Sequence, residues 1–111
     1  MRFSVRHYLS EDGHDPYQEW FDALKDNVAK IAIQRRLIKL EQGLLGDCDP
    51  VGEGVSELRL HLGPGYRVYF AIDRKTVYLI LGGGTKRRQA TDIKSAKARW
   101  SVYQARGTKT S

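Results

Sequence analysis

Residues 57–72 read ELRLHLGPGYRVYFAI, in which two stretches of alternating residues are separated by a glycine-proline-glycine turn. Alternation with a period of two is typical of a β-strand that buries one face. One face of the first strand carries Leu58, Leu60 and Leu62, and one face of the second carries Tyr66, Val68, Phe70 and Ile72. The stretch therefore predicts a β-hairpin.

Downstream of this hairpin, residues 73–76 have the composition of a second tight turn and residues 77–81 form a short apolar run. A third strand of the same meander is expected there. Residues 82–89 then read as a glycine-rich exit followed by a basic cluster. A last helix is predicted after them, capped by Thr91 or Asp92 and carrying its apolar side on Ile93, Ala96, Trp100 and Tyr103.

Upstream, residues 2–9 alternate and predict a strand whose inward face is Phe3, Val5, His7 and Leu9. Asp15 and Pro16 have the positions of an N-cap and a first helical residue, with Gln18 placed to close a capping box. Asp26-Asn27 breaks this helix and caps a second, which ends at Gly43. Residues 44–56 hold several glycines and a proline, and we expect an irregular connection there.

These elements predict an α+β fold with an N-terminal strand, a helical hairpin, an antiparallel β-sheet of about four strands and a C-terminal helix. We expect a single domain over residues 1–104 and a polar C-terminal tail over residues 105–111.

Composition narrows the class of protein. The chain is 41% hydrophobic and 29% charged, which is typical of a globular domain and not of a disordered chain. Its longest strongly apolar run, residues 77–81, is too short to span a membrane. Cys48 is the only cysteine, which excludes an internal disulfide and a multi-cysteine metal site. We expect a cytoplasmic protein that needs no cofactor and no metal ion.

Charge is distributed unevenly along the chain. Residues 1–56 contain seven Lys and Arg against ten Asp and Glu, whereas residues 57–111 contain twelve against three. Such asymmetry is typical of a surface that binds a polyanion, either nucleic acid or an acidic protein. A basic face that serves only solubility is the alternative.

The candidate site follows from the same alternation, because the leucines of the first strand leave Arg59 and His61 on its other face. Arg67 and Tyr69 are expected on that face of the next strand, close enough to converge on one ligand. Guanidinium groups bind phosphate through paired hydrogen bonds, and a histidine can transfer a proton near neutral pH. A solvated charge pattern that includes Glu57 is the alternative.

Further residues can extend this candidate site. The basic run Lys86-Arg87-Arg88 follows the glycines, whose backbone can approach an anion closely. Tyr66 and Tyr69 offer aromatic rings for an exposed base, although Tyr66 falls on the expected core face.

The chain resembles the RelE/ParE superfamily of toxins from type II toxin–antitoxin systems, in particular the HigB-like addiction-module killer proteins. Three segments carry the resemblance: 54–60 (GVSELRL), 63–70 (GPGYRVYF) and 79–86 (LILGGGTK), followed by Gln89 and Asp92-Ile93. It covers residues 2 to 100. It implies the fold predicted above and an antitoxin partner, expected to be of the helix-turn-helix type.

The resemblance also implies an activity, because members similar to RelE and HigB cut mRNA on the ribosome without a metal ion, using the ribose 2′-hydroxyl as nucleophile. By position, Arg59 and Arg67 would hold the scissile phosphate, Lys86 would stabilise the transition state or the leaving group, and Gln89 would help to position the backbone. His61 is the candidate for proton transfer. Two alternatives remain: a ParE-like inhibitor of DNA gyrase that cuts no RNA, and an inactive member that only binds antitoxin or nucleic acid.

Overall fold

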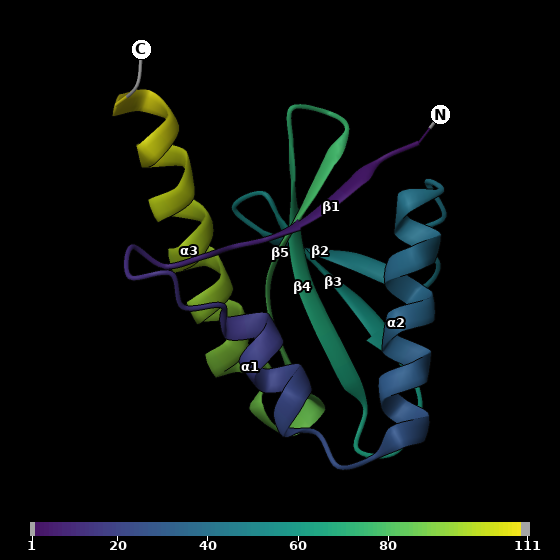
Figure 1. Ribbon diagram of the computed structural model, residues 1–111. Coiled ribbons are helices and arrows are strands. Elements are labelled where there is room, and N and C mark those ends of the chain that lie inside the picture. The colour runs from purple at the N-terminus through teal and green to yellow at the C-terminus, as the bar shows by residue number, and fades with distance from the viewer. Residues whose placement is uncertain (1, 110–111) are drawn as a thin grey trace.

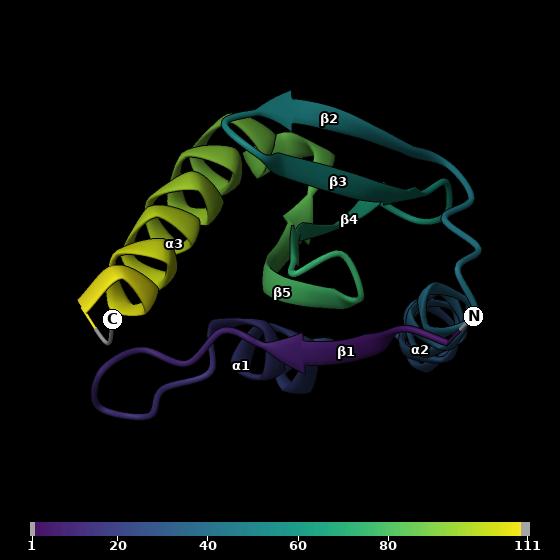
Figure 2. The ribbon, with the colours of Figure 1, turned by 90° about the horizontal axis from the view of Figure 1, so that it is seen from above.

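A five-stranded mixed sheet forms the centre of the structure, and helices cover both of its faces (Figures 1 and 2). The computed structural model describes residues 2–109. Its elements in chain order are β1 (Ser4–His7), α1 (Pro16–Ala23), α2 (Asn27–Glu41), β2 (Cys48–Gly52), β3 (Val55–Leu60), β4 (Tyr66–Asp73), β5 (Val77–Thr85), the 3₁₀ turn η1 (Lys86–Arg88) and α3 (Gln89–Lys109). The predicted α+β fold class is confirmed.

The strand order is β1-β5-β4-β3-β2, with β1 parallel to β5 and every other pair antiparallel. The prediction of about four antiparallel strands is therefore corrected to five strands in a mixed sheet. The strand that the sequence concealed is β2, which lies within residues 44–56, where an irregular connection was expected. An edge strand tolerates Pro50, whose missing N–H need not serve a neighbour, and the β2–β3 register shifts between Pro50 and Gly52.

The helical hairpin begins and ends where the capping residues predict. The carboxylate of Asp15 accepts a hydrogen bond from the Gln18 backbone N–H at 3.0 Å, and that of Asp26 accepts one from Ala29 at 3.1 Å. At the end of α2, Gly43 has a φ of 80°, which glycine adopts without strain. The Gln18 side chain bonds to Asp22 and does not close the expected capping box.

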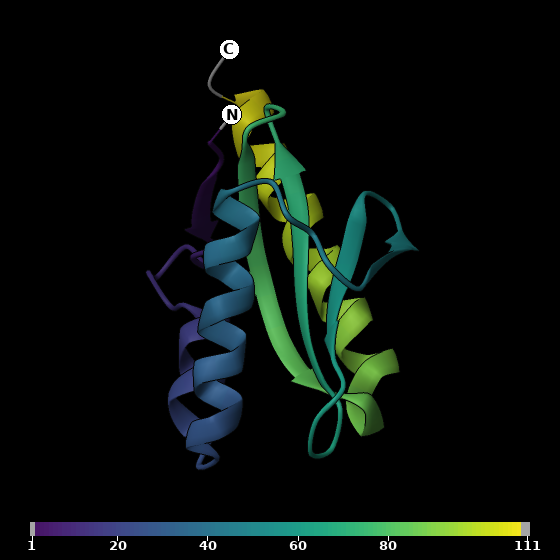
Figure 3. The same ribbon diagram turned by 90° about the vertical axis from the view of Figure 1, so that its right-hand side faces the viewer.

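Two hydrophobic clusters lie on opposite faces of the sheet. The first packs α1 and α2 against β3, β4 and β5, and it includes Tyr17, Ile33, Leu58, Val68 and Ile80. The second packs α3 against the other face, and it includes Tyr69, Leu79, Leu81, Ala96 and Trp100. Figure 3 shows α2 and α3 on either side of the strands. Both faces of β4 are therefore covered, where its alternation predicted only one.

The longest helix, α3, extends further than the sequence predicts. It begins at Gln89, before the expected caps Thr91 and Asp92, and it continues through residues 105–109 of the expected polar tail. Near its C-terminus, Arg106 donates a hydrogen bond to the Leu9 carbonyl at 2.8 Å and lies over the ring of Tyr8. Neither α3 nor any other helix within residues 2–109 is long and apolar enough to cross a membrane.

The N-terminal segment also differs from its predicted facing. Tyr8 is buried in the second cluster, whereas Leu9, expected on the inward face, is exposed. The chain leaves the sheet after His7, so the alternation of β1 does not continue to Leu9.

The glycines of residues 82–84 lie inside β5 and do not form an exit from it, because the strand continues to Thr85. A β-carbon at Gly83 would overlap the ring of Trp20 in α1, and one at Gly84 would overlap the carboxylate of Asp92 in α3. The absence of side chains at these two positions lets α1 and α3 approach the strand from opposite faces.

Replacing Gly83 by alanine is expected to destabilise the fold, because the new methyl group displaces Trp20 from the core. The free energy of unfolding should fall by about 1–3 kcal/mol, or more, in urea denaturation. A matched control is Gly107→Ala in α3, where an added β-carbon meets nothing within 4 Å; it should raise stability by up to about 1 kcal/mol. Equal stability of G83A and the unaltered protein would contradict the close packing of Trp20.

Candidate functional site

Arg59 and Arg67 lie directly opposite each other on β3 and β4. They share the face of the sheet that α3 covers, as the alternation predicted, because their neighbours Leu58, Leu60 and Val68 point into the core on the other face. Opposed residues of antiparallel strands have β-carbons about 4.5–5.5 Å apart. The strand register alone thus brings two guanidinium groups together.

A buried carboxylate lies between the two arginines. The oxygens of Glu57 are 3.9 Å from Arg59 Nη1 and 4.0 Å from Arg67 Nε. The side-chain amide of Gln89, at the start of α3, donates to both of these oxygens at 2.9 Å. Only 3% of the Glu57 side chain is exposed, and a charge buried to that degree needs such partners. The sequence offered Glu57 only as part of an alternative, solvated charge pattern, whereas this carboxylate is buried and contacts both arginines.

On its outer side, Arg59 is bound by two acidic residues at the start of β2, one just before the strand and one within it. Its Nη2 atom is 3.0 Å from an oxygen of Asp47 and also pairs with Asp49. Asp47 bonds to His61 as well, and hydrogen bonds from His61 and then Arg59 hold the pKa of Asp47 below its usual range. The stabilisation from these contacts is fully present at a pH above the ordinary carboxyl pKa. It is lost as the pH falls through the lowered pKa of Asp47.

The acidic segment is fixed in place by Arg36 of α2. Its guanidinium donates to the backbone carbonyls of Leu45, Asp47 and Arg59 at 3.0, 3.0 and 2.7 Å. One side chain therefore joins α2, the loop before β2 and the strand that carries Arg59. Neither Arg36 nor the two aspartates belonged to the site predicted from the sequence.

The two arginines differ in accessibility. The Arg67 side chain is 7% exposed, whereas that of Arg59 is 26% exposed. Arg67 Nη1 donates to the Gly65 carbonyl at 3.2 Å, and the backbone N–H of Lys86 donates to the same oxygen at 2.8 Å. Lys86, Arg87 and Arg88 form the exposed turn η1 beside Arg67. A buried cation therefore lies next to a rim of exposed ones.

His61 lies beyond the end of β3 and its side chain is 72% exposed. It shares a cavity of about 340 Å³ with Arg59, Asp47 and residues of α2. The structure thus brings His61 to the outer side of Arg59 and away from the buried Glu57 carboxylate.

Neither tyrosine of the predicted site presents a ring face to solvent. Tyr66 is buried in the first cluster, 6.4 Å from the ring of Trp20 between centroids. Tyr69 is fully buried under α3. Tyr66 thus lies on the core face that its alternation predicted, whereas the burial of Tyr69 corrects the expectation of an open face. Neither ring lies open for a base, because helices cover both faces of β4.

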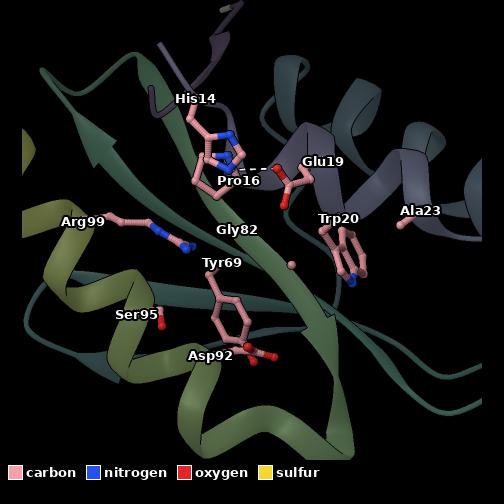
Figure 4. Close-up of a pocket in the computed structure, with 11 residues that line it drawn as sticks. His14, Pro16, Glu19, Trp20, Ala23, Tyr69, Gly82, Asp92, Ser95 and Arg99 are labelled. Atoms are coloured by element: carbon pink, nitrogen blue, oxygen red, sulfur yellow. Dashed lines mark ion pairs between the residues drawn. The ribbon is translucent and has the colours of Figure 1, made fainter. Parts of the chain in front are cut away.

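A second cavity, also of about 340 Å³, lies between α1 and α3 over the glycines of β5 (Figure 4). Trp20 forms one wall, Asp92 and Arg99 form the other, and burial raises the pKa of Asp92. Within residues 2–109, the Tyr69 hydroxyl and Asp92 Oδ2 have no hydrogen-bond partner. No group of three His, Cys, Asp or Glu side chains in that part of the chain is arranged to hold a metal ion.

Comparison with known proteins places this geometry in context. No protein-family model matches the chain. An uncharacterized protein of Haemophilus influenzae is 40% identical over 81 residues, which are 73% of this chain and 82% of that protein. The structure of E. coli toxin RelE, solved as a mutant in the free state, superposes with a TM-score of 0.63 at 15% identity, covering 89% of this chain and 97% of that one. The likeness confirms the predicted RelE-like fold.

Glu57→Gln tests the electrostatic centre of the cluster. Removing the negative charge leaves Arg67 buried without its counter-ion, and the free energy of unfolding should fall by about 3 kcal/mol. The matched control is Glu53→Gln, because Glu53 is exposed and pairs with Lys97 on the surface; its effect should stay within about 0.5 kcal/mol. Urea denaturation of both variants measures the difference, and equal small effects would remove Glu57 from its central role.

Proposed function

This chain belongs to the same family as the H. influenzae protein and has the fold of RelE, and we propose that it is the toxin of a type II toxin–antitoxin system. Its activity is ribosome-dependent cleavage of mRNA without a metal ion, which arrests translation. The observation that carries this proposal is the pair of opposed arginines around one carboxylate, with Lys86 adjoining through Gly65.

Cleavage of RNA at its own 2′-hydroxyl needs a proton acceptor, a cationic pocket and a proton donor. Glu57 accepts the 2′-hydroxyl proton as the 2′-oxygen forms its bond to phosphorus. Arg59 and Lys86 stabilise the charge that develops on the phosphorane oxygens. The bond from phosphorus to the 5′-oxygen then breaks, and His61 protonates that oxygen. The products are a 2′,3′-cyclic phosphate and a 5′-hydroxyl.

Because Arg67 is buried and Arg59 is accessible, the two arginines have different roles. Arg59 is the accessible guanidinium and contacts the phosphate directly. Arg67 faces Glu57 from the covered side, and its positive charge balances and orients this carboxylate. Gln89 covers Glu57 in the free protein, so the first turn of α3 must move away from Glu57 when RNA binds. Arg87 and Arg88 then attract the backbone on either side of the cleaved bond.

Arg59→Ala tests the proposed activity in cells. Induced expression of the unaltered chain, in the absence of antitoxin, should stop translation and create new mRNA 5′ ends within codons. The R59A variant should lose most of this toxicity, because removing one preorganised donor at a developing oxyanion costs about 100- to 1000-fold in rate. Lys94→Ala, an exposed cation on α3, is the charge-matched control and should remain toxic.

Two results would contradict the assignment. Full toxicity of R59A at equal protein abundance would place the active site elsewhere. Growth arrest with intact transcripts, together with inhibition of plasmid supercoiling by DNA gyrase in vitro, would support a ParE-like inhibitor in place of a nuclease.

Asp47→Asn combined with Asp49→Asn should strengthen RNA binding, because Arg59 then loses the carboxylates that occupy its outer side. We expect a gain on the order of tenfold, the equivalent of one charge-assisted hydrogen bond. The plot of log affinity against log salt should also steepen by about 0.7. Fluorescence anisotropy with a labelled single-stranded RNA at several salt concentrations measures both quantities.

The control for that experiment changes the net charge equally at a distant place. Asp12→Asn with Asp22→Asn removes two exposed carboxylates from the loop after β1 and from α1. An equal gain in the two double variants would indicate a general charge effect and would refute the specific role of Asp47 and Asp49.

A further inference from the structure

An exposed apolar stripe follows the outer side of α2. Val28, Ile31 and Ile38 have exposed fractions of 71%, 50% and 54%. Spacings of three and seven residues place them on one side of a helix. The opposite side of α2, with Ala29, Ile33 and Leu40, packs into the first hydrophobic cluster. We call the three exposed residues the α2 stripe.

Two further exposed apolar residues lie just beyond the C-terminus of the helix. Leu44 and Leu45 follow α2 and are also exposed, and they line a shallow cavity with Lys39 and Arg36. Scattered apolar residues are ordinary on a protein surface, but a row of them along one helix is typical of a protein interaction site. An amphipathic helix can bind such a row by packing its own apolar face against it.

Charge narrows the kind of partner. α2 contains four cations and one anion, Glu41, and two of the cations, Arg35 and Lys39, are exposed. Arg35 lies between Ile31 and Ile38 on the exposed side. If a second copy of this chain bound here, its α2 cations would lie against the same cations of the first copy, and this repulsion would weaken the dimer. The complementary partner is an amphipathic helix with acidic residues along the edge of its apolar face.

We propose that the α2 stripe binds an acidic amphipathic helix of the antitoxin; the identity of this partner rests on the proposed function, whereas its chemistry rests on the stripe. Arg35 and Lys39 line the cavity whose other wall carries His61 and Arg59. Acidic side chains of a helix on the stripe reach into that cavity and compete with RNA phosphates for Arg59. Docking on α2 thereby neutralises the toxin without covering the buried Glu57.

The test is the double variant Ile31→Asp with Ile38→Asp. This variant is co-expressed with the protein encoded by the neighbouring gene, the expected antitoxin. Both positions are exposed, so the variant should fold and remain toxic when expressed alone. Co-expression should no longer rescue growth, and the affinity of the two purified proteins, measured by titration calorimetry, should fall about 100-fold. The matched control is Ile72→Asp with Val102→Asp, two exposed apolar residues of β4 and α3, which should still be rescued.

The outcomes separate the two proposals. If the neighbouring gene's product still rescues growth of cells that express the α2 variant, and binds this variant with unchanged affinity, the docking site is wrong. An unaltered chain that is not toxic would contradict the proposed function, while calorimetry on the same two proteins would still decide the docking site. A dimer of the unaltered chain in light scattering, converted to monomer by the α2 variant, would instead assign the stripe to a second copy and overturn the proposal.

Discussion

The packing of α1 and α3 against the sheet depends on the lack of side chains at Gly83 and Gly84 of β5. The Trp20 ring of α1 occupies the space of a missing β-carbon on one face, and the Asp92 carboxylate of α3 does so on the other. The first turn of α3 therefore lies against the strand, and from there Gln89 reaches Glu57. A steric feature of one strand thus sets the geometry of a charged cluster two strands away.

The cluster of Glu57, Arg59 and Arg67 allows positive charge to be buried in the sheet. Two guanidinium groups on opposed strands would repel each other, and Glu57 between them offsets this repulsion where water cannot. Asp47 and Asp49 perform the same function for the exposed side of Arg59. In the free protein Arg59 is consequently held in a network of ion pairs, and an anion that binds it must compete with the protein's own carboxylates.

The sequence predicted features that depend on neighbouring residues. The caps Asp15, Asp26 and Gly43 and the shared face of Arg59 and Arg67 all follow from local spacing. It failed where distant segments meet: Tyr69 was expected on an open face, but α3, which follows twenty residues later, covers it. Likewise β2 lies at the edge of the sheet and shows no apolar alternation, and it carries Asp49, which pairs with Arg59 across the strands.

Cys48 gives this edge strand a practical property. It is the sole cysteine of the chain and opens β2, between Asp47 and Asp49. Its side chain packs partly against the core, and burial raises the pKa of its thiol, which slows its reaction with alkylating reagents at neutral pH. Thiol chemistry therefore probes the start of β2 without engineering, and the rate of labelling reports how accessible this one side chain is beside Asp47 and Asp49.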